Sequence, residues 1–177
     1  MKTIISKLTA FTFFVMLGIS QVSCQNTKQK DMVKSSESHE RVADNTEFPK
    51  AKSDKEWKEK LTPQQYYIMV EAGTEPAFDN AYYDNHKEGV YVSAATGEPL
   101  FSSETKFDSG TGWPSFTKPI NDDAVIWVKD TSLGMVRDEV IEKSTGLHLG
   151  HVFMDGPAPS HIRYCINSAA LKFKEKK

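Results

Sequence analysis

The sequence has little cysteine and no long apolar segment after Ile19. Cys24 and Cys165 are the only two thiols among 177 residues, so no disulfide framework can form and a hydrophobic core has to stabilise the fold. The net charge is −2, and no block of one sign stands out in the second half, which gives no reason to expect a nucleic-acid partner. There is no internal repeat. The length suits one domain with appendages, and we expect a monomer.

The N-terminus is typical of an export signal. Lys2 and Lys7 precede the apolar segment Leu8 to Ile19, which is too short to span a bilayer but suits a secretory h-region. Residues 21–24 (Gln-Val-Ser-Cys) then resemble a bacterial lipoprotein cleavage box, although such boxes usually carry Leu, Val or Ile in place of Gln21. We therefore predict a lipoprotein-type signal peptide over residues 1–23 and lipidation of Cys24, with plain secretion as the open alternative.

The predicted location is the periplasmic side of the envelope. A lipid on Cys24 would anchor the chain to a membrane, and Gln25 directly after it favours the outer membrane. Residues 24–52 are rich in charged and small polar side chains, with Phe48 the only aromatic. Such a segment buries too little apolar surface to order itself, so we expect a disordered tether.

The folded domain is expected over residues 53–175, and it should open with two short helices. Ser53 with Glu56, and Thr62 with Gln65, each have the spacing of a capping box, and Pro63 suits a first helical position. The second helix carries apolar residues at helical spacing and should stop near Gly73.

Short runs rich in Val, Ile and aromatic residues follow, separated by Gly, Pro, Asn and Asp. Runs of this composition are typical of β-strands, and the connections are too short for crossover helices. The sequence therefore predicts a mainly β domain with antiparallel sheets. The expected strands are residues 89–93, 124–129, 139–142, 151–154 and 162–167.

Three patches carry reactive side chains: residues 110–116 (GTGWPSF), 148–153 (HLGHVF) and 163–168 (RYCINS). A cysteine attacks only as its thiolate, and a neighbouring cation lowers the thiol pKa. Positions two apart in a strand share a face, so Arg163, Cys165 and Asn167 should lie together.

Each patch taken alone also has a structural interpretation. Cys165 could be a small buried hydrophobe. His148 and His151 could be a hydrogen-bonded pair, because a lone His-x-x-His is a weak metal signal. Trp113 could be a core aromatic. The residues by themselves leave these alternatives open.

The motifs taken together resemble those of the B-type methionine-R-sulfoxide reductases. The resemblance covers residues 54 to 173 and rests mainly on residues 109–116, 148–157 and 163–168. It is extended by Leu61-Thr62-Pro63, Gly73-Thr74-Glu75 and Pro99-Leu100-Phe101. It implies two antiparallel sheets and the reduction of methionine-R-sulfoxide in proteins to methionine, with the sulfoxide epimer inherited from the family.

The resemblance also implies roles for individual residues. Cys165 would attack the sulfoxide sulfur and become a sulfenic acid, and His151, with His148 beside it, would donate the proton. Asn167 would orient the histidines or a water. The expected substrate-binding residues are Trp113, whose indole would face the substrate methyl group, with Arg163, Asp155 and Phe153.

The sequence departs from the family pattern at two places. Many relatives hold a structural zinc with two Cys-x-x-Cys pairs, where this chain has Ser93, Thr96, Glu142 and Thr145, so we expect no cofactor and no metal. Many relatives also have a resolving cysteine where Thr111 stands. The sulfenic acid would then be reduced by an external thiol or a thioredoxin-like partner, with Cys24 on its tether as an alternative resolver.

Three other functions compete with repair of oxidised proteins. A non-catalytic module of the same fold could bind a ligand in an aromatic cage, but a cage would not need Cys165 and the histidines. A secreted cysteine hydrolase would need an oxyanion hole and an orienting partner for its base, and the sequence indicates neither. A metal-dependent hydrolase using His148 and His151 is weaker still.

Overall fold

The computed structural model describes residues 48–177, apart from the side chain of Leu133. The predicted signal peptide, Cys24 and most of the predicted tether lie outside the described residues. The last tether residues, 48–52, contact the domain, because the Lys50 amide donates to the Ser144 carbonyl at 2.8 Å.

The helices and 3-10 turns are α1 (Asp54–Lys60), α2 (Pro63–Met69), η1 (Ser103–Thr105), η2 (Ser132–Gly134) and η3 (Ser168–Ala170). The strands are β1 (Gly89–Ser93), β2 (Pro99–Ser102), β3 (Lys106–Phe107), β4 (Ser115–Phe116), β5 (Val125–Asp130), β6 (Arg137–Glu142), β7 (His148–Phe153), β8 (Arg163–Ile166) and β9 (Leu171–Glu175).

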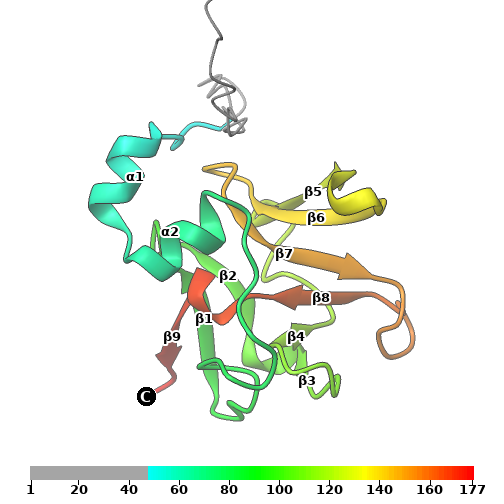
Figure 1. Cartoon of the computed structure of the whole chain (residues 1–177). Coiled ribbons are helices and arrows are strands. Elements are labelled where there is room, and N and C mark those ends of the chain that lie inside the picture. Colours follow the sequence, from blue (N-terminus) through cyan, green and yellow to red (C-terminus); the bar gives the residue numbers. More distant parts are fainter. Residues whose placement is uncertain (1–47) are drawn as a thin grey trace, which may run out of the picture. The chain divides into compact units, whose positions relative to one another are not determined.

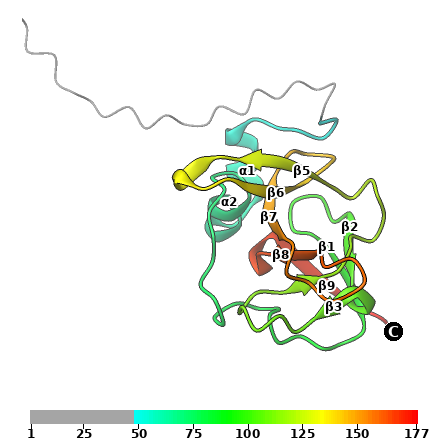
Figure 2. The ribbon, with the colours of Figure 1, turned by 90° about the vertical axis from the view of Figure 1, so that its right-hand side faces the viewer.

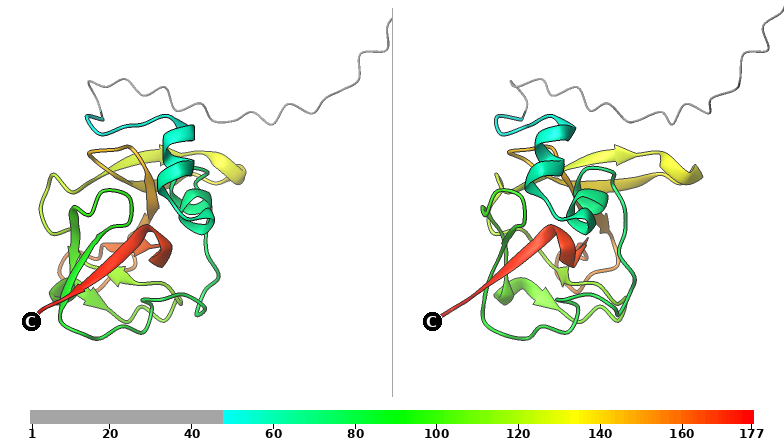
Figure 3. Two further views of the ribbon diagram at one scale, coloured as in Figure 1. Left: turned by 90° about the vertical axis from the view of Figure 1, so that its left-hand side faces the viewer. Right: turned by 60° about the vertical axis from the view of Figure 1, so that its left-hand side comes forward.

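Both predicted capping boxes are present at the starts of α1 and α2. In each, the side chain of the cap residue accepts from the third helical amide, and the side chain of that third residue accepts from the cap amide. α2 ends at Met69, earlier than Gly73, and buries Ile68 and Met69. Figure 3 shows α2 beside η3. None of the helices over residues 48–177 is long and apolar enough to cross a membrane.

The strands form two antiparallel sheets, which confirms the predicted class. One sheet has the order β2-β1-β9, and the other has the order β3-β4-β8-β7-β6-β5. In Figure 1 the six strands of the larger sheet follow one another from β3 at the bottom to β5 at the top. The β5–β6 hairpin lies at one edge of this sheet, and Figure 2 shows it from the side.

Aromatic side chains from both sheets meet in the core. Phe101 of β2 stacks on Phe116 of β4 with ring centroids 4.5 Å apart, and Tyr91 of β1 meets Phe116 edge-on at 5.1 Å. All three are fully buried, and burial of such a side chain contributes roughly 1.5–3 kcal/mol. The core therefore joins the smaller sheet to β4, which pairs directly with β8.

An irregularity in β7 determines which of its side chains share a face. Val140 of β6 pairs with Gly150, and the next residue, Ile141, pairs with His148, so Leu149 is an extra residue in β7. Strict alternation would put residues three apart on opposite faces. The bulge restores a common face for His148 and His151, whose rings lie 5.4 Å apart.

Gly150 allows β7 to approach β8 closely at Cys165. A Cβ atom at position 150 would lie 2.0 Å from the Cys165 carbonyl oxygen, which is far inside any van der Waals contact. A residue with a side chain would therefore push the two strands apart.

We predict that Gly150→Ala lowers the free energy of unfolding by roughly 2 kcal/mol, the usual cost of overpacking. Urea unfolding of the purified protein measures it. Gly134→Ala is the matched control, since a Cβ there meets nothing within 4 Å and only the positive φ of 71° opposes it, at a cost of about 1 kcal/mol. Equal losses in the two variants would contradict the close approach.

Candidate active site

Cys165 lies in β8 between two strands that each carry a polar partner opposite it. Its Cα pairs with His151 of β7 on one side and with Ser115 of β4 on the other. Residues directly opposite in an antiparallel pair have Cβ atoms about 4.5–5.5 Å apart. Cys165 is half-buried, whereas Tyr164 and Ile166 are buried on the other face. The structure thus brings the predicted nucleophile and His151 together.

Burial dominates the ionisation of Cys165. It raises the pKa of the thiol above its usual range, and the nearby Asp155 charge acts in the same direction, while Arg163 and the Thr111 hydroxyl lower it. Arg163 therefore acts on the sulfur in the expected direction, but it does not outweigh burial. The resting protein holds Cys165 mainly as the thiol at neutral pH.

Arg163 is a buried cation with two fixed neighbours. Its Nε and a terminal nitrogen donate to the two carboxylate oxygens of Asp155 at 2.8 and 2.9 Å, and its guanidinium lies 4.5 Å from the centre of the Phe153 ring. The paired Arg163 holds the pKa of Asp155 below its usual range. Asp155 and Phe153 thus hold the guanidinium in place, and much of its charge is already compensated.

Each histidine of the pair binds one carboxylate. His151 Nε2 lies 2.8 Å from Asp130 Oδ2, and His148 Nδ1 lies 2.7 Å from Glu139 Oε1. An ionised carboxylate only accepts, so these nitrogens carry the protons. Neutral His151 therefore has its lone pair on Nδ1. The buried Nε2 of His148 has no hydrogen-bonding partner among the described residues.

Asp130 belongs to a small charged network at the end of the β5–β6 hairpin. Arg137, its direct partner across the hairpin, donates to Asp130 Oδ2 at 2.7 Å, and the Ser132 amide donates to Oδ1 at 2.8 Å. Burial opposes the ionisation of Asp130, but hydrogen bonds from Ser132, His151 and Arg137 prevail and hold its pKa well below its usual range. Asp130 is therefore ionised at neutral pH.

Burial also controls His151, whose pKa it lowers. The Asp130 hydrogen bond raises this pKa in part, while the nearby His148 and Arg137 lower it. At neutral pH the imidazole is therefore neutral and can accept a proton.

Sequence reasoning missed Asp130, Arg137 and Glu139. The available signal was that oppositely charged residues stand at the facing ends of two strands of one hairpin.

Glu75, which the sequence analysis named only as part of a family motif and gave no role, fixes two predicted site residues. The Trp113 indole N–H donates to the Glu75 carbonyl at 3.1 Å, and the Glu75 amide donates to the Asn167 side chain at 3.2 Å. The Asn167 amide group donates to the Leu149 carbonyl at 3.1 Å. Asn167 is therefore bound to backbone atoms on both sides, and the imidazoles take their orientation from Asp130 and Glu139. Trp113 is half-buried and held at the loop that precedes β4.

The four positions named above for their lack of zinc-binding thiolates form a hydrogen-bonded cluster. Buried Glu142 accepts from the hydroxyls of Ser93 at 2.9 Å, Thr96 at 2.5 Å and Thr145 at 2.9 Å. The hydroxyls are poor zinc ligands and are already used as donors to the carboxylate. These residues do not fit a zinc ion. Within residues 48–177, no group of three His, Cys, Asp or Glu side chains could hold a metal.

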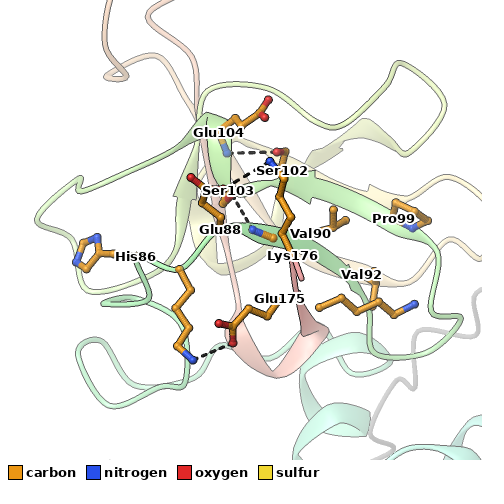
Figure 4. A pocket seen from close by; sticks show the side chains of 13 residues that line it. His86, Glu88, Val90, Val92, Pro99, Ser102, Ser103, Glu104, Glu175 and Lys176 are labelled. Carbon is orange, nitrogen blue, oxygen red and sulfur yellow. Dashed lines mark hydrogen bonds and ion pairs between the residues drawn. The ribbon is translucent and has the colours of Figure 1, made fainter.

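A groove of about 700 Å³ lies elsewhere, against β1, β2 and β9 (Figure 4). Its lining includes none of the predicted site residues. Two of its charged pairs are already formed, Lys87 with Glu175 at 2.9 Å and Lys176 with Glu88 at 3.5 Å. The groove therefore presents no unpaired charge from these residues to a ligand.

Comparison with known proteins identifies the family. Residues 61–175 match the SelR domain. Three relatives are each named peptide methionine sulfoxide reductase MsrB. The protein from Leptospira interrogans is 56% identical over 124 residues, 70% of this chain and 95% of the relative. The protein from Thiobacillus denitrificans is 54% identical over 125 residues, 71% and 95% of the two chains. The protein from Methanosarcina barkeri is 55% identical over 123 residues, 70% and 87% of the two chains. The chain therefore belongs to the family of B-type peptide methionine sulfoxide reductases, which confirms the resemblance of its motifs.

Proposed function

We propose that this protein reduces methionine-R-sulfoxide in oxidised proteins to methionine and that Cys165 is the nucleophile. Family membership supports the reaction class. The observation that carries the residue assignment is the strand register, which sets Cys165 opposite His151. The Trp113 indole, held by Glu75, supplies an apolar surface for the methyl group on the substrate sulfur.

The first step transfers the sulfoxide oxygen to Cys165. As the thiol loses its proton to His151 Nδ1, the thiolate attacks the sulfoxide sulfur and forms an S–S bond, and the imidazolium returns the proton to the sulfoxide oxygen. The resulting hydroxyl then moves to Cys165: the S–S bond and the S–O bond of the substrate break, and an S–O bond to Cys165 forms. A thiol and a sulfoxide give a sulfenic acid and a thioether, so protons balance and Cys165 is oxidised by two electrons.

The second step restores the thiol with external reductant. Cys165 is the only cysteine among residues 48–177, and Thr111 cannot form a disulfide. We therefore assign the two reducing equivalents to an external dithiol, such as a thioredoxin-like protein, or to two monothiols. The sulfenic acid gives water and a mixed disulfide, which a second thiol resolves to the Cys165 thiol and an external disulfide.

The proposed location is the periplasmic side of the outer membrane, where a lipid on Cys24 would anchor the chain. This rests on residues 1–25 alone, which lie outside the described residues. A lipid anchor and a long tether would let a soluble catalytic domain reach oxidised proteins near the membrane.

The proposed nucleophile predicts that Cys165→Ser abolishes turnover of methionine-R-sulfoxide with dithiothreitol as reductant, measured as methionine released. Serine has no readily formed anion and cannot accept the oxygen in this way. Cys24→Ser is the matched control and should keep activity, while methionine-S-sulfoxide should be a poor substrate. Turnover by Cys165→Ser would refute the assignment, and loss of activity in Cys24→Ser would make Cys24 the resolving thiol.

The shared proton predicts a bell-shaped pH dependence of kcat/KM. The reactive form has one proton between Cys165 and His151, so activity falls below the lowered pKa of His151 and above the raised pKa of Cys165. Asp130→Asn removes the carboxylate that supports the imidazolium. The acid limb should therefore move to lower pH and the plateau should fall by about tenfold or more. An unchanged acid limb would show that Asp130 does not act on His151.

We further propose that no structural zinc is bound, because the Glu142 cluster uses its donors internally. Metal analysis of the purified full chain should find far less than one zinc per chain. Cysteine at all four positions (S93C, T96C, E142C and T145C) provides the comparison, since thiolates at this spacing should bind zinc. Stoichiometric zinc in the unaltered chain would overturn this proposal.

A further inference from the structure

Three hydroxyl groups form a chain in the loop that leads into β4. Ser115 Oγ lies 2.8 Å from Ser109 Oγ, and Ser109 Oγ lies 2.8 Å from Thr111 Oγ1. Ser115 is fully buried and pairs directly with Cys165 across the β4–β8 ladder. The chain therefore starts beside the nucleophile in the sheet and continues through the loop.

The loop backbone brings Thr111 back toward the sulfur. Gly110 and Gly112 have positive φ angles of 72° and 88°, which turn the chain sharply on either side of Thr111. A Cβ at position 112 would lie 2.7 Å from the Phe78 amide, so this turn is also closely packed. The Thr111 hydroxyl thereby comes near enough to Cys165 to lower the pKa of its thiol.

The hydrogen bonds give the chain a direction. Ser115 Oγ donates to Ser109 Oγ at 2.8 Å, and its other possible acceptor, the Trp113 carbonyl, lies farther away at 3.2 Å. Ser109 Oγ also accepts from the Thr111 amide at 3.3 Å. A hydroxyl has two acceptor sites and one proton, so the proton of Ser109 is left to donate to Thr111 Oγ1. The proton of Thr111 is then free to point to the sulfur. Hydroxyls in such a series polarise one another, which strengthens the last donor.

The sulfur needs such a donor because its surroundings oppose a negative charge. Cys165 is half-buried, and the nearby cation Arg163, which also lowers the pKa of the thiol, is bound to both oxygens of Asp155. A buried thiolate without hydrogen bonds would be costly. The hydroxyl chain supplies a neutral hydrogen-bond donor that, unlike Arg163, is not bound to a carboxylate.

We infer that the Thr111 hydroxyl is a catalytic group that donates a hydrogen bond to the Cys165 thiolate, and that Ser109 and Ser115 are positioning residues that orient it. The inference rests on the proposed function in that Cys165 is taken as the nucleophile. It assigns Thr111 a role in forming the thiolate.

The ionisation of Cys165 can be measured without sulfoxide reduction. The full chain carrying Cys24→Ser leaves one reactive thiol, and its alkylation by iodoacetamide is followed from pH 6 to pH 11 by mass spectrometry. The midpoint is the pH at which the alkylation rate reaches half of its maximum, and it reports the pKa of Cys165. In this background Thr111→Val should raise the midpoint by about one pH unit and slow alkylation near neutral pH about tenfold, as expected for a lost hydrogen bond to a charged group.

Conservative and matched variants separate this role from a structural one. Thr111→Ser keeps the hydroxyl and should restore the midpoint, and Ser109→Ala should raise it by a smaller amount. Thr117→Val is the control, because its hydroxyl donates to the Thr105 carbonyl at 3.4 Å and takes no part in the chain. It should leave the midpoint unchanged. If Thr111→Val misfolds, the Ser109→Ala midpoint decides.

Two outcomes would overturn the inference. One is an unchanged midpoint in folded Thr111→Val or, if that variant misfolds, in Ser109→Ala. The other is an equal rise in Thr117→Val, which would indicate a general loss of packing. Failure of the proposed function is recognised separately: unaltered protein would then release no methionine from the sulfoxide, while the alkylation midpoints could still differ as described.

Discussion

The antiparallel pairing of β7 with β8 is the constraint on which the site depends. It sets Cys165 directly opposite His151, and the missing side chain of Gly150 allows the close approach that this register requires. The bulge at Leu149 adds His148 to the same face. A shift of one residue in this ladder would turn the sulfur and the imidazole to opposite faces of the sheet.

The site combines a weakly acidic thiol with a weakly basic imidazole. Burial raises the pKa of Cys165 and lowers that of His151, so both groups are neutral at rest and share one proton. This arrangement protects the sulfur from indiscriminate oxidation and alkylation, because the thiolate is the reactive form. In the proposed reaction it also supplies the proton that the sulfoxide oxygen needs. The Asp130 carboxylate favours the imidazolium form of His151, and the Thr111 hydroxyl favours the thiolate form of Cys165.

Local patterns in the sequence predicted the local features of the fold. Both capping boxes are read from residues three apart, and the alternation around Cys165 correctly separates it from buried Tyr164 and Ile166. The predicted strand at residues 89–93 is confirmed at the same bounds, as β1. Strands β2, β3, β4 and β9 were not predicted. The two-residue strands β3 and β4 carry no periodicity, and the edge strands β2 and β9 are only partly buried.

The polar partners of the site depend on contacts between distant segments. Asp130 meets His151 across 21 residues and Glu75 meets Asn167 across 92, so no local spacing reveals them. The net effect of burial on Cys165 was likewise hidden, since the sequence shows Arg163 two positions away but not the enclosure of the sulfur. At the Glu142 cluster the sequence showed only that thiols are missing. The hydrogen bonds from the hydroxyls to the carboxylate are seen only in the folded structure.

Trapping the product of a single turnover tests the central claim most directly. The full chain is given one equivalent of methionine-R-sulfoxide without reductant, and a sulfenic-acid probe is then added. Release of one methionine per chain, with the probe attached to Cys165, is the expected result. Release of methionine with Cys165 unlabelled and still a free thiol would contradict the claim that this sulfur takes the oxygen.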